Sequence, residues 1–171
     1  PLLHPEYRRC LEMLNQSEVA RRACVIQYTN ASQLTGEQAD ALLDIPIVDR
    51  LVFSFDGFGD KESYEALRGP HYDQVLGNIR AFAAQAKARR PELRMVTETI
   101  LPKPGEVEGL SVPTSEEARA GLQEVFSPIG VEVGTRALHN YSGNEDLELA
   151  GSWPERVYGG CPFVENDSVY I

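Results

Sequence analysis

The chain has 171 residues, 42% of them hydrophobic, so it is long enough to bury one core of ordinary size. Its 26 acidic residues outnumber its 16 basic ones, and the formal charge of -10 argues against nucleic acids and anionic membrane surfaces as partners. The apolar runs are far shorter than the roughly 20 residues that cross a bilayer, and no basic-then-apolar signal sequence opens the chain, which favours the cytoplasm.

The first part of the chain predicts a helix, a strand and a second helix. Residues 5–15 carry apolar side chains at helical spacing, and Pro5 suits a first helical position. Residues 23–28 (ACVIQY) form a short β-rich run. The next helix is expected to begin where Thr35 and Gln38 occupy capping-box positions.

The following residues continue the alternation of strands and helices. Residues 50–55 (RLVFSF) are almost continuously apolar, as expected of a strand buried on both faces of a parallel sheet. Further strands are predicted over residues 94–101 and 130–138, and helices over residues 72–90 and after the Thr114 and Glu117 capping box.

This order of elements predicts right-handed βαβ units and a parallel sheet. Polar residues gather where the predicted strands end, at Thr29/Asn30, Ser54/Asp56, Thr97/Glu98 and His139/Asn140. In a (β/α) barrel such strand ends converge on one mouth. The predicted fold is therefore α/β, a partial parallel (β/α) barrel of TIM-like type with about four βα units over residues 1–143. Residues 144–171 are assigned to a linker and the start of a small cysteine-containing extension.

Residues 51–82 (LVFSFDGFGDKESYEALRGPHYDQVLGNIRAF) resemble radical S-adenosylmethionine (SAM) enzymes. The likeness lies in a strand ending S-x-D-G, a short acidic helix leading to an R-G pair, and a long helix ending N-I. Three further segments match in the family's order. PLLHPEY resembles the sequence after the G-G-E of the GGEP motif, and YTN resembles its T-N-G turn, with Ala31 in place of glycine. RALHNYSG and CPFVENDSVYI resemble the last barrel strand and the start of a SPASM extension.

The resemblance implies that SAM is bound by Ser54, Asp56, Arg68, Thr29 and Asn30. Hydroxyl and carboxylate groups at strand ends suit the ribose, adenine and amino-acid parts of SAM. Taken alone, Asp56 and Gly57 read as a turn, Arg68 as a salt-bridged helix end, and Asn30 as a turn residue.

Two residues are candidates for a substrate pocket. Glu98 lies in an otherwise apolar strand, where a carboxylate needs a partner or a polar cavity. Strand alternation places it opposite Thr97 and Thr99, so either Glu98 or the two threonines face the pocket. His139 follows the last predicted strand and serves either as a pocket base or as a structural histidine.

Three cysteines, Cys10, Cys24 and Cys161, are too few for a disulfide framework. The resemblance places Cys161 as the first ligand of an auxiliary iron–sulfur cluster, whose other ligands would follow Ile171. The family's C-x3-C-x2-C loop, which holds the catalytic [4Fe–4S] cluster, does not occur in these residues and is expected upstream of Pro1. The chain by itself is therefore expected to be inactive.

The implied activity is reductive cleavage of SAM to a 5′-deoxyadenosyl radical, which abstracts hydrogen from a small-molecule or peptide substrate. A flavodoxin or ferredoxin would supply the electron. Two alternatives remain open. One is a degenerate, cluster-less barrel that acts as a peptide- or nucleoside-binding module. The other is an unrelated barrel aldolase or isomerase, which would need a lysine or paired carboxylates at the strand ends.

Overall fold

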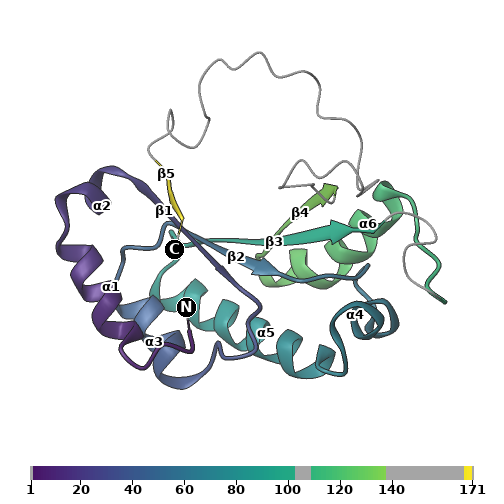
Figure 1. The fold of residues 1–171 in the computed structure, drawn as a ribbon, viewed down its shortest axis with the longest axis horizontal. Helices are drawn as coiled ribbons and strands as arrows, with labels where there is room; N and C mark the ends of the chain where they lie inside the picture. Colours follow the sequence, from purple (N-terminus) through teal and green to yellow (C-terminus); the bar gives the residue numbers. More distant parts are fainter. Residues whose placement is uncertain (1, 103–108, 138–167, 171) are drawn as a thin grey trace, which may run out of the picture.

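The computed structural model describes residues 2–102, 109–137 and 168–170. Its strands form one parallel sheet in the order β4-β3-β2-β1-β5 (Figure 1). The strands are β1 (Cys24–Thr29), β2 (Arg50–Ser54), β3 (Arg94–Leu101), β4 (Glu132–Ala137) and β5 (Ser168–Tyr170). The helices are α1 (Tyr7–Gln16), α2 (Glu18–Arg22), α3 (Gly36–Asp44), α4 (Lys61–Arg68), α5 (Tyr72–Arg89) and α6 (Ser115–Phe126), followed by a 3-10 turn, η1 (Ser127–Ile129).

The four predicted strands are parallel and lie side by side in chain order, which confirms the α/β class and the parallel sheet. The short strand β5 pairs with the start of β1, so β4 and β5 are the two edges of the sheet in the described residues. These strands therefore form an open sheet. The described residues do not show the predicted closure into a TIM-like barrel. The proposed boundary between residues 143 and 144 lies outside the described ranges.

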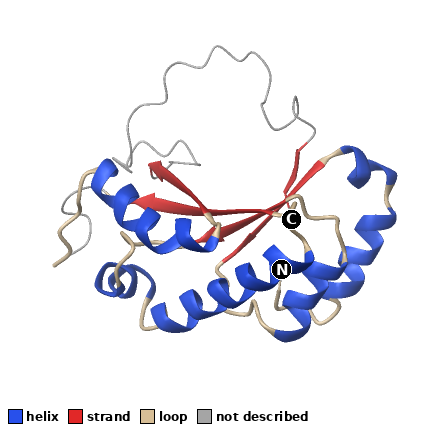
Figure 2. Cartoon of the chain, turned by 180° about the vertical axis from the view of Figure 1, so that it is seen from behind, coloured by secondary structure: helices blue, strands red, loops and turns tan. Residues whose placement is uncertain are grey.

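Helices α1, α3, α5 and α6 share one hydrophobic core with one face of the sheet, here called the helix face. Figures 1 and 2 show the helices gathered on that side. Strand side chains that point into this core include Val25, Leu51, Phe53 and Met95, and Phe55, directly after β2, joins them. Because side chains alternate along a strand, their neighbours lie on the other side of the sheet, here called the opposite face. The opposite face carries Ile26, Tyr28, Val52, Ser54, Val96 and Glu98.

The predicted helix starts are partly right. Thr114 and Glu117 form the predicted capping box: the Glu117 amide donates to Thr114 Oγ1 at 3.2 Å, and the Thr114 amide donates to the Glu117 carboxylate at 2.9 Å. The capping box at Thr35 is wrong, because the Thr35 hydroxyl accepts no hydrogen bond from the helix. Gly36 has a φ of 52°, which turns the chain away from the usual cap geometry. Helix α1 begins at Tyr7 instead of Pro5.

A buried arginine ties the helix layer to the start of β2. Arg90 is only 4% exposed, and its guanidinium donates to the carbonyl oxygens of Leu42 at 2.8 Å and Val48 at 2.5 Å.

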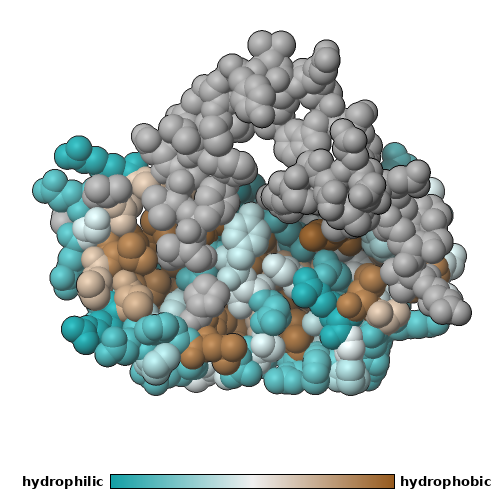
Figure 3. Space-filling model, in the orientation of Figure 1, coloured by the Kyte–Doolittle hydropathy of each residue, from teal (hydrophilic) through white to brown (hydrophobic). Residues whose placement is uncertain are grey.

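No helix in the described residues has the length and apolar character needed to span a membrane. In the view of Figure 3, hydrophilic residues form much of the rim and hydrophobic residues gather in smaller patches within it.

Candidate functional site

A hollow of about 340 Å³ lies at the carboxyl ends of β1 and β2. Carboxyl ends of parallel strands are where α/β proteins place their ligands. The lining residues are mostly polar and offer hydroxyl, carboxamide and guanidinium groups. They are Leu2, Leu3, Tyr28, Thr29, Asn30, Ser32, Gln33, Ser54 and Arg68.

The hollow collects most of the residues that the sequence assigns to SAM binding. Thr29, Asn30, Ser54 and Arg68 all line it. The fifth residue, Asp56, is joined to Arg68 by an ion pair. These residues come from the ends of β1, β2 and α4, so folding brings three separate segments together. His139 and Cys161, assigned to a substrate pocket and an auxiliary cluster, lie outside the described residues.

Asp56 holds the arginine and the neighbouring strand at the same time. Its Oδ2 accepts a hydrogen bond from Arg68 Nε, and its Oδ1 accepts one from the Ile100 amide at 3.2 Å. Its side chain is only 14% exposed, whereas that of Arg68 is 42% exposed. Gly69, with a φ of 84°, ends α4 directly after Arg68. Asp56 therefore orients the guanidinium through Nε, and the terminal nitrogens of Arg68 can meet a ligand.

The loop after β2 is built on close backbone contacts. Gly57 and Gly59 both have a φ of 100°, a conformation that favours glycine. A Cβ at Gly57 would lie 2.8 Å from the Tyr64 amide nitrogen, and a Cβ at Gly121 of α6 would overlap the Phe58 carbonyl oxygen. The D-G-F-G sequence thus lets the loop pack against α4 and α6, which fixes the position of Asp56.

Asp60 and Ser63 complete the same loop at the start of α4. The Ser63 amide donates to Asp60 Oδ1 at 2.8 Å, and the Phe58 amide donates to Ser63 Oγ at 2.8 Å. Burial raises the pKa of the Asp60 carboxyl, but the hydrogen bonds from Ser63 outweigh burial and leave the pKa below its ordinary value. Asp60 is therefore an ionised helix cap that supports the site from outside the hollow.

The loop after β1 forms the other wall of the hollow. The Ala31 amide donates to Thr29 Oγ1 at 3.0 Å, and the Ser32 amide donates to Asn30 Oδ1 at 3.1 Å. The Leu34 amide donates to the Ala31 carbonyl at 3.2 Å and closes the turn. The predicted residues Thr29 and Asn30 therefore shape this wall as well as line it.

Strand alternation decides between Glu98 and the flanking threonines. Thr97 and Thr99 are fully buried on the helix face, and Thr99 Oγ1 donates to the Phe55 carbonyl at 2.5 Å. Glu98 is half-buried on the opposite face, where Ser54 is its neighbour on β2. The Tyr28 hydroxyl donates a long hydrogen bond of 3.5 Å to Glu98 Oε1. Glu98 is thus connected, through Tyr28, to the wall of the hollow.

The sequence did not single out Tyr28, Ser32 and Gln33 as lining residues. Strand alternation predicts that Tyr28 and Thr29 point to opposite faces of the sheet. It does not show which residue of β2 lies beside Tyr28. The strand register shows that this residue is Val52, two residues before Ser54. Ser32 and Gln33 belong to a turn whose path depends on Ala31, a residue that rarely adopts a positive φ.

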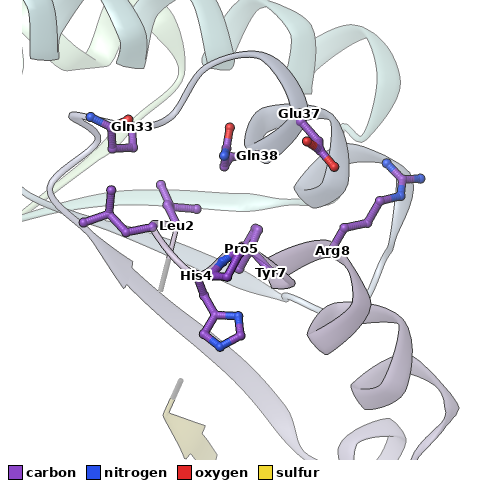
Figure 4. A pocket seen from close by; sticks show the side chains of 9 residues that line it. Leu2, His4, Pro5, Tyr7, Arg8, Gln33, Glu37 and Gln38 are labelled. Atoms are coloured by element: carbon purple, nitrogen blue, oxygen red, sulfur yellow. The ribbon is translucent and has the colours of Figure 1, made fainter.

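A second, more polar hollow of about 280 Å³ lies beside the first and shares Leu2, Leu3 and Gln33 with it. Figure 4 shows its remaining walls: Glu37 and Gln38 belong to α3, Tyr7 and Arg8 begin α1, and His4 and Pro5 come just before α1. It contains none of the residues that the sequence assigned to SAM.

The described residues include no group of three or more His, Cys, Asp or Glu side chains arranged to hold a metal ion. Cys10 and Cys24 are free and exposed. No protein-family model matches the chain, and a comparison with curated proteins finds no similar sequence.

Proposed function

We propose that this chain is the SAM- and substrate-binding part of a radical SAM iron–sulfur enzyme. The observation that carries the proposal is the gathering of Thr29, Asn30, Ser54 and Arg68 around one hollow, with Asp56 holding Arg68. The resemblance assigned these residues from separate sequence motifs, without any knowledge of the sheet register.

The chemistry of the hollow suits the parts of SAM. Hydroxyl and carboxamide groups from Ser54, Ser32 and Asn30 match the polar edges of a ribose and an adenine. The guanidinium of Arg68, fixed at Nε by Asp56, presents its terminal nitrogens to the carboxylate of the amino-acid end. A volume of about 340 Å³ lies within the range of small-molecule sites.

In the intact enzyme, a [4Fe–4S] cluster would reduce bound SAM and so start hydrogen abstraction from the substrate. The described residues do not fit such a cluster, because they contain no suitable group of ligands. The part of the activity assigned to this chain is therefore to bind and orient SAM and the substrate.

The substrate is assigned to the opposite face of the sheet, next to Ser54. Glu98 and Tyr28 lie there as a hydrogen-bonded pair. A carboxylate recognises hydrogen-bond donors, so the pair suits a hydroxyl or ammonium group of a small molecule or peptide.

A (β/α) barrel would account for this opposite face. Strands in chain order, with the described helices on one side, have the arrangement of consecutive barrel strands. From the amino ends of the strands upward, the opposite face carries Arg50 and Arg94, then Val52 and Val96, then Ser54 and Glu98. Such layers of side chains are typical of a barrel interior.

Calorimetric titration of SAM into wild-type chain, Arg68→Gln and Arg119→Gln tests the proposal. Arg119 is exposed on α6 and does not line the hollow, so its variant matches the change in charge. We expect Arg68→Gln to weaken SAM binding about tenfold or more, the scale of a charge-assisted hydrogen bond, and Arg119→Gln to leave it unchanged.

Adenosine serves as a second probe, because it lacks the amino-acid end of SAM. Its affinity should be the same in wild type and Arg68→Gln. If wild type binds no SAM at millimolar concentration, or if the two arginine variants lose SAM equally, the proposal is wrong.

A further inference from the structure

Asn78 of α5 reaches across to the loop after β1. Its Nδ2 donates to the carbonyl oxygens of Ala31 at 2.9 Å and Ser32 at 3.2 Å. Both partners are acceptors only, so the amide group of Asn78 must point its nitrogen toward them. Gln74, one turn earlier in α5, adds a weaker contact of 3.4 Å to the Ser32 carbonyl.

The loop needs this support because Ala31 is in the left-handed region, with a φ of 59°, and is fully buried. A residue with a Cβ is unfavourable in this conformation and keeps it only where surrounding contacts enforce it. The internal bonds of the loop, from Ala31 to Thr29 and from Leu34 to Ala31, fix its own turn. Asn78 makes the two shorter of the three hydrogen bonds that tie this turn to α5, and Gln74 makes the third.

The loop is a large part of the hollow. Thr29, Asn30, Ser32 and Gln33 are four of its nine lining residues. If the turn around Ala31 relaxed, these four side chains would move together, while Ser54 and Arg68 on the other wall would keep their own supports.

We propose that Asn78 is a positioning residue for the hollow. It locks the left-handed turn at Ala31 and thereby holds the β1 wall in the conformation that receives a ligand. The effect on SAM affinity rests on the proposed function, whereas the effect on the loop does not.

The test compares Asn78→Asp with Gln85→Glu in the full 171-residue chain. Asn78→Asp keeps the size of the side chain but replaces the donor with a carboxylate oxygen facing two carbonyl oxygens. Gln85→Glu makes the same chemical change on the exposed side of α5, where the amide bonds only within the helix, to Ala81 and Arg89.

Hydrogen exchange of the loop amides is the first readout. In Asn78→Asp, the amides of Ala31, Ser32 and Leu34 should exchange about tenfold faster or more, while the amides of β3 stay protected. Calorimetry with SAM is the second readout, with about fivefold to tenfold weaker binding expected for the loss of the two hydrogen bonds. Gln85→Glu should match wild type in both.

Wild-type exchange rates in the loop of a folded Asn78→Asp variant would overturn the proposal. Faster exchange with unchanged SAM affinity would also overturn it, because the loop would then not position the ligand. If wild type itself binds no SAM, the proposed function fails, and hydrogen exchange alone decides whether Asn78 holds the loop.

Discussion

The two faces of the sheet bury their polar side chains to different extents. On the helix face, Gln27, Thr97 and Thr99 are buried: Tyr7 donates to Gln27 at 2.7 Å, and Thr99 donates to the Phe55 carbonyl. On the opposite face, Ser54 and Glu98 are half-buried at the strand ends beside the hollow. Neighbouring residues of one strand therefore differ in exposure, since Thr97 and Thr99 are buried in the core and Glu98 is half-buried on the face beside the hollow.

Among the substitutions that test this comparison, the largest loss of stability is expected in the helix layer. In Gly121→Ala the new Cβ would overlap the Phe58 carbonyl oxygen, so α6 and the loop after β2 must move apart. We expect the free energy of unfolding to fall by about 1 to 3 kcal/mol, as in other overpacked sites. Urea denaturation measures it.

Gly77→Ala is the matched control, because Gly77 lies within α5 and a Cβ there would meet no atom of a neighbouring element within 4 Å. The same substitution there should raise the free energy of unfolding by up to about 1 kcal/mol through helix propensity. Equal effects at both glycines would contradict the close contact between α6 and the loop.

A smaller difference in stability is expected between substitutions at two adjacent residues of β3, Thr99 and Glu98. Thr99→Val leaves the buried Phe55 carbonyl without its donor, which should cost about 1 to 2 kcal/mol of stability. Glu98→Gln changes a half-buried side chain on the opposite face and should alter stability by less than about 0.5 kcal/mol. A reversed order in urea denaturation would mean that the two faces are assigned wrongly.

The smallest effect concerns the outer surface of the helix layer. Hydrogen bonds from Arg89 and Arg8 hold the pKa of the Asp44 carboxyl below its ordinary value. A depressed pKa contributes stability that is present above the unfolded pKa, about 4, and is lost as the pH falls through the folded pKa. Asp44→Asn should therefore be less stable than wild type at pH 7, and the difference should shrink toward pH 3. A constant difference in thermal unfolding would contradict this ion-pair cluster.

Hydrophobic pattern and turn residues were enough to predict the four parallel strands β1 to β4, but not the pairing of β5 with β1. Strand β3 has the predicted bounds, residues 94–101, and the Thr114 capping box is present. Periodicity is a local property, so it locates strands and helices well. The capping-box pattern of Thr35 and Gln38 was misleading, because the positive φ of Gly36 changes the geometry of the cap.

The candidate site was predictable only in part, because it depends on contacts between distant segments. Strand ends indicated Ser54 and Asp56, but the sequence could not show that Asp56 would bond to Arg68 and to the Ile100 amide. The sequence also could not decide which face of the sheet carries Glu98. Alternation shows only that Glu98 and its two neighbouring threonines lie on different faces. The left-handed turn at Ala31 gave no local signal, because alanine rarely adopts it.

The most direct test of the central claim is to map the SAM site on an isotopically labelled chain by NMR. Chemical-shift changes on adding SAM should be largest at the amides of Asn30, Ser32 and Ser54, around the hollow at the ends of β1 and β2. The amides of Glu37 and Gln38, in the neighbouring hollow of Figure 4, should change little. An unchanged spectrum, or changes confined to the neighbouring hollow, would contradict the assignment of SAM to this site.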